Sequence, residues 1–188
     1  MTRGSTLSAH RLSDLPDRLV VPALPEQTRT PPPAPTALDG FNGVPAAEAR
    51  HLLLSCLRSP RWAHRVTVHR PYPTLDAVLA ASDEAAYDLT ASDLAEALAG
   101  ESLPALSPHA YGAAHMALNA AHAAYEARFG HLFVICLDGV PPHESLDHTL
   151  EAIRSRLAND PEEERVVTAE ELRRLARARL ASLLRTGG

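Results

Sequence analysis

Apolar side chains recur every three or four residues along most of the chain from about residue 38 onward, which is the spacing of amphipathic helices. Alanine, leucine, glutamate and arginine dominate these stretches, and all four favour helix. Pattern and composition together predict an all-α fold class, a single compact multi-helix domain with an aliphatic core. The predicted helices span Ala46–Leu57, Arg61–His69, Leu75–Ala81, Glu84–Leu89, Ala91–Ala99, Ser107–Gly130, Glu144–Leu157 and a last one that runs to about Leu184.

Local start and stop signals mark several of these helix ends. Ser107 followed by Pro108 is typical of an N-cap and a first helical position, and Gly130 is typical of a C-terminal stop. Thr168 begins a Thr-x-x-Glu pattern, that of a capping box. We therefore predict that the last helix opens at Thr168.

One run departs from the helical pattern. Leu132–Leu137 is a continuous apolar stretch rich in β-favouring residues. No second run of this kind is available to pair with it, so we expect a buried extended segment or the start of a helix rather than a sheet.

The first part of the chain has a different composition. Residues 1–37 hold nearly half of the 16 prolines. Proline at this density removes backbone donors and blocks helix, which predicts a disordered or extended segment. We therefore divide the chain into a Pro-rich segment, 1–37, and a helical domain, 38–186.

The charged residues restrict the chemistry. All 18 basic residues are arginine, so a Schiff-base lysine and the lysine of a phosphate-binding Walker A loop are both excluded. The net charge of -5 argues against a nucleic-acid-binding surface. Any bound anion must be held by arginine, histidine or backbone N–H groups, and we expect no cofactor.

Cysteine usage and hydropathy favour a cytoplasmic protein. Cys56 and Cys136 both lie in apolar runs, which predicts two reduced thiols in the core, and no zinc-type spacing is present. No stretch reaches the ~18 consecutive apolar residues of a membrane span, and the N-terminal residues do not have the pattern of a signal peptide.

A polar stripe follows one face of the predicted helix Ser107–Gly130. His115 and His122 are two turns apart, roughly 10 Å by helix rise, which is too far for one metal ion. We therefore expect a solvated or subunit-facing stripe and no metal site. Its members are Tyr111, His115, Asn119, His122 and Glu126.

Several motifs occur in the order found in one enzyme family. They are Cys56-Leu57-Arg58-Ser59-Pro60-Arg61-Trp62-Ala63, Arg70-Pro71-Tyr72, Tyr125, Arg128-Phe129-Gly130, Arg156-Leu157-Ala158-Asn159-Asp160, Glu171, Arg174-Leu175 and Arg179-Leu180. In this order, over roughly residues 40–184, the chain resembles the 2-oxo-4-hydroxy-4-carboxy-5-ureidoimidazoline (OHCU) decarboxylases, which finish the conversion of urate to (S)-allantoin. The resemblance implies their helical fold and a cofactor-free lyase.

The likeness fails where that family keeps its acid/base pair. Family members carry a His-Pro segment after an alanine-rich helix and a Ser-x-x-Glu-Gln segment after that. Aligning the helix ends places Glu101 at the histidine and Ala110 at the glutamate. The resemblance then implies that Glu101, with His109 nearby, performs the proton transfer. The alternative is that Glu101 is a solvated loop carboxylate and His109 a surface residue.

The remaining site residues also follow from the resemblance. Arg174 or Arg179 would hold the anionic substrate, because a guanidinium binds a carboxylate with two parallel hydrogen bonds. The turn Phe129-Gly130-His131 would present an aromatic wall and main-chain groups, and Ser107 and Tyr111 would complete the pocket. The alternative for the arginines is a solvated helix paired with nearby acids.

Three functional hypotheses remain open at this point. The leading one is a homodimeric decarboxylase that acts on a small anionic ureide, with no nucleic-acid or membrane partner. A catalytically silent relative that keeps the fold as a binding module is the second. A lyase or isomerase acting on a different small heterocycle is the third.

Overall fold

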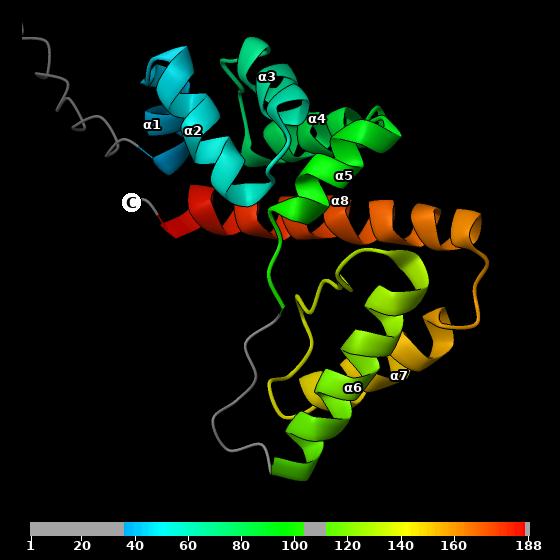
Figure 1. Ribbon diagram of the computed structural model, residues 1–188. Coiled ribbons are helices and arrows are strands. Elements are labelled where there is room, and N and C mark those ends of the chain that lie inside the picture. The colour runs from blue at the N-terminus through cyan, green and yellow to red at the C-terminus, as the bar shows by residue number, and fades with distance from the viewer. Residues whose placement is uncertain (1–35, 104–111, 187–188) are drawn as a thin grey trace, which may run out of the picture. The chain divides into compact units, whose positions relative to one another are not determined.

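Residues 36–103 and 112–186 are described by the computed structural model, and the helices in these ranges account for most of their length (Figure 1). No strand is present among them. This confirms the all-α prediction. The helices are α1 (Ala37–Gly43), α2 (Ala46–Cys56), α3 (Pro60–Val68), α4 (Leu75–Tyr87), α5 (Ala91–Ala99), α6 (Gly112–Phe129), α7 (Ser145–Arg156) and α8 (Pro161–Thr186).

Short polar side chains set where the helices begin. Thr36 and Thr90 each form a reciprocal capping box with the aspartate three residues on, at the starts of α1 and α5. Ser59 and Thr74 cap α3 and α4 with their hydroxyls. Gly130 ends α6 with a left-handed φ of 77°, as its position in the sequence predicts.

Three helix boundaries differ from the predictions. Helix α1 was not predicted, because its seven residues are too few to show a periodic pattern. Leu75–Ala81 and Glu84–Leu89 are not separate helices: both belong to the continuous α4, which ends at Tyr87, two residues before the predicted end. Ser82 and Asp83 mark the predicted break, yet both lie inside the helix. The Ser82 carbonyl oxygen accepts a hydrogen bond from Trp62, and Asp83 binds two arginines of α8, so tertiary partners hold these polar residues.

The last helix also begins earlier than predicted. Helix α8 starts at Pro161, where the Asp160 carboxylate accepts hydrogen bonds from the backbone N–H groups of Glu162 and Glu163 at 2.9 Å each. Thr168 therefore lies within the helix and caps nothing. Its buried hydroxyl accepts a hydrogen bond from Arg156, so the threonine of the Thr-x-x-Glu pattern belongs to a buried polar network and not to a capping box.

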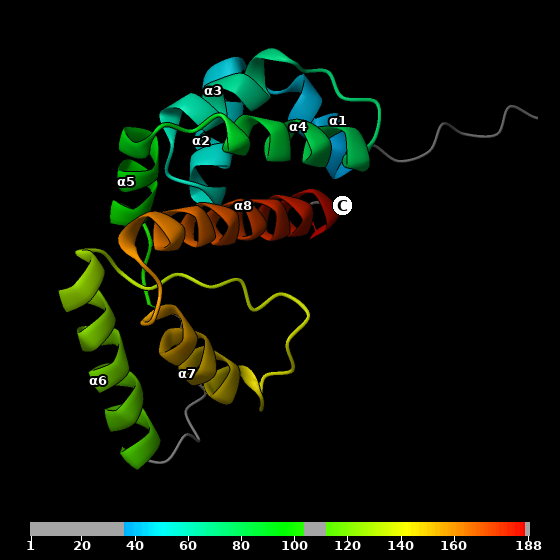
Figure 2. The same cartoon turned by 90° about the vertical axis from the view of Figure 1, so that its right-hand side faces the viewer.

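Helix α8 borders two apolar clusters. The larger one joins α1–α5 to one face of α8 through Phe41, Trp62, Val78, Leu172 and Leu180. The smaller one joins α6 and α7 to the segment after α6, through Tyr125, Phe133 and Ile153 among others. Both views show α1–α5 on one side of α8 and α6–α7 on the other (Figures 1 and 2).

The run Leu132–Leu137 is extended and has no neighbouring strand, as the sequence predicts. Side chains replace the missing strand partners. Arg156 donates to the Val134 carbonyl oxygen at 2.7 Å, and Glu171 accepts from the Cys136 N–H at 2.6 Å. Residues on both sides of this run are buried, and these two hydrogen bonds satisfy polar groups that would otherwise be costly to bury.

A buried ion pair joins α7 to α8. The Arg156 guanidinium donates to the Glu164 carboxylate at 2.8 and 2.6 Å, and both side chains are almost fully buried. The hydroxyl of Tyr125 and the amide of Asn159 donate to the same carboxylate. The pair therefore has enough hydrogen bonds to offset part of its desolvation cost.

The two thiols are buried and unbridged, as predicted. Among the described residues, no helix combines the length and apolarity needed to cross a bilayer. The proposed Pro-rich segment, 1–37, lies almost entirely outside the described residues and stays a prediction.

Removing one partner of the buried ion pair should destabilise the fold strongly. We expect Arg156→Met to lower the free energy of unfolding by about 3–5 kcal/mol, because Glu164 would keep a buried, unpaired charge. Arg154→Met, at an exposed position on the same helix, should change it by less than about 0.5 kcal/mol. Urea denaturation measures both. Equal effects of the two substitutions on the free energy of unfolding would contradict the conclusion that the Arg156–Glu164 pair holds the fold together.

The same pair should make stability pH-dependent. Burial alone would raise the pKa of the Glu164 carboxyl, but hydrogen bonds from Arg156 and Tyr125 outweigh it and hold the pKa below its ordinary value of 4.5. A lowered pKa in the folded state contributes stability that is present above the unfolded-state pKa and lost as pH falls through the folded-state value. The stability difference between wild type and Glu164→Gln should therefore be constant near neutral pH and shrink below pH 4.5. A difference that stays constant down to about pH 3 would contradict this.

Candidate active site

Glu101 and Arg179 face each other across the junction of α5 and α8. Each carboxylate oxygen accepts a hydrogen bond from a different guanidinium nitrogen, at 2.8 and 2.7 Å. This is the fork-to-fork arrangement that gives arginine–carboxylate pairs their directionality. Only 6% of the Glu101 side chain is exposed, so the predicted alternative of a solvated loop carboxylate is wrong.

Arg179 has a third hydrogen bond in this site. Its Nη1 also donates to the Cys56 carbonyl oxygen at the end of α2, at 3.0 Å. The hydrogen bond to Glu101 is the main reason that the pKa of Arg179 is raised, and the negative charge of Glu101 adds to it. Burial raises the pKa of the Cys56 thiol, so that thiol stays protonated at neutral pH. The site therefore brings together the ends of α2 and α5 with the C-terminal part of α8.

Gly100 fixes the backbone that presents Glu101. It is the C-cap of α5, and the side chain of Arg58 crosses its Cα position. A Cβ at Gly100 would lie 2.6 Å from the Cβ of Arg58 and 2.1 Å from its Cδ. Neither Gly100 nor Arg58 was predicted to belong to the site, although a glycine directly before the proposed catalytic carboxylate indicates a close backbone approach.

Arg174, the other predicted anion ligand, lies on a different side of α8. It is five residues from Arg179, which places the two about 140° apart around the helix axis. Arg174 donates to Glu171 at 2.8 Å, and Glu171 in turn accepts from the Cys136 N–H. Arg174 therefore supports the extended segment instead of facing Glu101.

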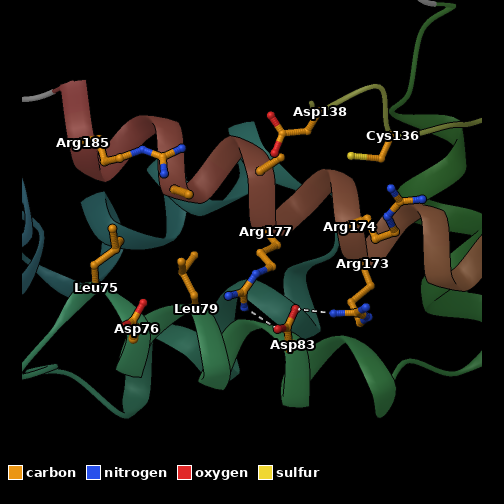
Figure 3. Close-up of a pocket in the computed structure, with 12 residues that line it drawn as sticks. Leu75, Asp76, Leu79, Asp83, Cys136, Asp138, Arg173, Arg174, Arg177 and Arg185 are labelled. Atoms are coloured by element: carbon orange, nitrogen blue, oxygen red, sulfur yellow. Dashed lines mark hydrogen bonds and ion pairs between the residues drawn. The ribbon is translucent and has the colours of Figure 1, made fainter. Parts of the chain in front are cut away.

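A groove of about 630 Å³ runs along α8 between α4 and the end of the extended segment (Figure 3). Asp83 of α4 lies between Arg173 and Arg177, with contacts of 2.8 and 2.5 Å. Arg174 and Cys136 lie on the opposite side of the helix from Asp83 (Figure 3). Neither Glu101 nor Arg179 lines this groove, and its arginines are largely neutralised by acidic neighbours.

The structure does not bring the turn Phe129–His131 beside Arg179. The rings of Phe129 and His131 pack around Tyr125, with centroids 4.8 and 5.6 Å from it. Tyr125 in turn binds Glu164 near the start of α8. Glu164 and Arg179 are separated by roughly 20 Å along the helix axis. The turn thus lies at the other end of α8 from the Glu101–Arg179 pair.

Three predicted site residues, Ser107, His109 and Tyr111, lie outside the described residues. Their predicted roles stay predictions.

The polar stripe on α6 is not uniformly solvated. Asn119 and Glu126 are exposed, but His122 is buried, with its ring packed edge-on against Phe133. The prediction was therefore wrong for His122, because the chain folds its extended segment over that side of α6. Within the described ranges, no three potential metal ligands come together.

The family model for OHCU decarboxylase matches the chain in two stretches, residues 42–107 and 105–181. Together these stretches cover most of the sequence. The chain belongs to the OHCU decarboxylase family. The two stretches meet at residues 105–107, between Glu101 and Ala110, the two positions that the helix-end alignment predicts for the family's histidine and glutamate.

Solved structures agree on the fold. A crystal structure of an (S)-allantoin synthase has a TM-score of 0.61 and 21% identity, covering 78% of this chain and 54% of that one. This chain thus corresponds to about half of that protein. An OHCU decarboxylase crystallised in the presence of (S)-allantoin has the same TM-score and identity, covering 70% of this chain and 95% of that one. No protein with a curated description matches the sequence.

A substitution at Gly100 should test how tightly this junction is built. We expect Gly100→Ala to destabilise the protein by about 1–3 kcal/mol, because the Arg58 side chain and backbone must shift. Gly40→Ala is the matched control: its Cβ meets nothing within 4 Å in α1, and it should stabilise the protein by about 0.5–1 kcal/mol. Thermal and urea unfolding give both values. A neutral or stabilising Gly100→Ala would show that the contact with Arg58 is not a constraint.

Proposed function

We propose that this protein is a carboxy-lyase that converts a urate-derived ureidoimidazoline to (S)-allantoin, or acts on a close analogue. The observation that supports this most directly is the Glu101–Arg179 pair. A protected carboxylate and a guanidinium lie together in a member of a decarboxylase family. The helix-end alignment predicts that this carboxylate stands where the family has its acid/base histidine.

The chemistry of the reaction defines what the site must do. The bond from the hydroxyl-bearing ring carbon to the carboxylate breaks and CO₂ leaves. The electron pair is delocalised over the heterocycle until a proton reaches the neighbouring, ureido-bearing carbon, and the hydroxyl-bearing carbon becomes a carbonyl. Arg179 would bind the carboxylate before it leaves. Glu101 would deliver the proton to the ureido-bearing ring carbon, a contribution of about 10²–10⁴-fold in rate. No lysine is available for a covalent alternative.

The other predicted residues would have supporting roles. His109, Ser107 and Tyr111 would complete the pocket from the altered segment. The turn Phe129–His131, anchored on Tyr125, would set where the extended segment starts, since it lies far from Arg179 along α8. Arg174 would hold Glu171, which binds the backbone of Cys136.

A catalytically silent binding protein is the second candidate. One observation favours it: both carboxylate oxygens of Glu101 already accept hydrogen bonds from Arg179, and such a pair can hold α5 to α8 without taking part in catalysis. A lyase or isomerase acting on another small heterocycle would use the same residues and would differ in the ligand that stabilises the protein.

The proposed protein is a cytoplasmic homodimer. It binds a small anionic ureide as its substrate and binds neither nucleic acid nor membrane. The surface of α6 supports the dimer. Met116 is 70% exposed there, and small residues at Ala117, Ala120 and Ala124 on the same helix are exposed as well. These side chains would allow close approach of a second copy.

The activity is tested with substrate generated in place from urate by urate oxidase and hydroxyisourate hydrolase. We expect the protein to accelerate the appearance of (S)-allantoin, followed by circular dichroism. Glu101→Gln should reduce kcat by about 10²–10⁴-fold. Glu96→Gln removes an exposed carboxylate from α5 and should leave kcat unchanged. Absence of any acceleration by the wild-type protein would eliminate the decarboxylase proposal and leave the binding protein.

A further inference from the structure

The Glu101 carboxylate occupies the atoms of Arg179 that a bound carboxylate would use. Its two oxygens accept from the two terminal nitrogens of the guanidinium, and one of these nitrogens also donates to the Cys56 carbonyl oxygen. Arg179 is still 40% exposed, so an incoming ligand can reach it, whereas Glu101 is shielded. A substrate carboxylate can form the same bidentate pair only if Glu101 moves aside.

We propose that Glu101 is an internal carboxylate that is exchanged for the substrate carboxylate at Arg179 and takes up a proton as it leaves. This inference rests on the proposed function, because it assumes that the site accepts a carboxylated ureide. It adds a binding order and a source for the proton that the reaction consumes.

The charges around the pair explain why the exchange would require a proton. Before exchange, one guanidinium faces one carboxylate. After exchange, two carboxylates lie beside the same guanidinium, and like charges at such distances favour protonation of one of them. The other groups that face this site are the Cys56 thiol on α2, the Cys136 thiol on the extended segment and Arg58 beside Gly100. The thiols cannot neutralise a carboxylate. Arg58, His51 and Glu96 line one pocket with Gly100, so Arg58 and His51 are the basic side chains there that would compete for a displaced Glu101.

The proton then has a direct use in the reaction. Neutral Glu101, displaced but still next to the substrate, donates its proton to the ureido-bearing ring carbon after CO₂ leaves. The regenerated carboxylate returns to Arg179 and the product, which has lost its carboxylate, is released. One proton enters with the substrate and one is consumed per turnover, so the charges balance.

Calorimetry with two inert cyclic ureides tests the exchange without turnover. Hydantoin-5-acetate carries a carboxylate and hydantoin does not. Titrating each at one pH in buffers of different ionisation enthalpy gives the number of protons taken up on binding. For the wild type we expect uptake that approaches about one proton per site for hydantoin-5-acetate and none for hydantoin.

Glu101→Gln should separate binding from proton uptake. A neutral amide competes poorly for a guanidinium, so the fraction of protein with a free Arg179 rises. The variant should then bind hydantoin-5-acetate about tenfold more tightly or better, with no linked proton. Its affinity for hydantoin should stay within about twofold. Tighter binding of the carboxylate together with lost turnover would not be expected from a merely structural Glu101.

Two arginine substitutions on α8 provide the matched control. Arg179→Met, in the Glu101→Gln background, should abolish the gain in affinity. Arg177→Met in the same background should preserve it, because Arg177 has a similar exposure but pairs with Asp83. Thermal unfolding of each variant checks that the fold is retained.

Different results overturn different parts of the proposal. If Glu101→Gln binds hydantoin-5-acetate no more tightly than wild type, or if neither protein binds it, carboxylate exchange is wrong. If the affinity rises but the wild type takes up no proton, Glu101 moves to Arg58 as an ion and the proton-uptake step is wrong. None of these measurements requires turnover, so a failed activity assay and a failed exchange are distinguishable.

Discussion

An extended segment without a neighbouring strand must find other partners for its buried backbone, and this constraint links the two halves of the described structure. Arg156 from α7 binds the Val134 carbonyl oxygen, and Glu171 from α8 binds the Cys136 N–H. Arg156 is fixed in turn by Glu164, and Glu171 by Arg174. Charged side chains therefore hold the segment against α8, with apolar side chains packed on either side of it.

The arginines of α8 bind different partners on different sides of the helix. Arg173 and Arg177 tie α8 to α4 through Asp83, Arg174 supports the extended segment, and Arg179 faces Glu101. Most of these pairs are partly exposed and contribute little to stability individually. Their value lies in fixing the rotation of α8, because a helix with several bound arginines has one favourable orientation.

In the alignment predicted from the helix ends, a glutamate stands where the family has a histidine, and this exchange would change the electrostatics of the site. A histidine next to an arginine leaves the guanidinium available to an anion. A glutamate at that position supplies an anion of its own, which matches Arg179 in charge and in geometry. Binding a carboxylated substrate then becomes a competition between two carboxylates. An active site requires that the substrate carboxylate displaces Glu101 from Arg179. A silent site is one in which Glu101 stays bound.

Local and global information contributed differently to this structure. The all-α class, the stop at Gly130, the lone extended run and the buried thiols follow from short-range patterns, because capping, periodicity and hydropathy act over a few residues. The order of motifs was also enough to indicate the family, and it placed Glu101 and either Arg174 or Arg179 among the candidate site residues.

The features that depend on contacts between residues far apart in the sequence were decided only by the tertiary structure. Sequence could not show that Ser82 and Asp83 lie within a continuous helix, because Trp62, Arg173 and Arg177 hold them there. It could not choose between two arginines five residues apart, since the direction of each depends on the rotation of α8. The exposure of Glu101 was likewise open until the long-range packing of α2, α5 and α8 placed a guanidinium against it.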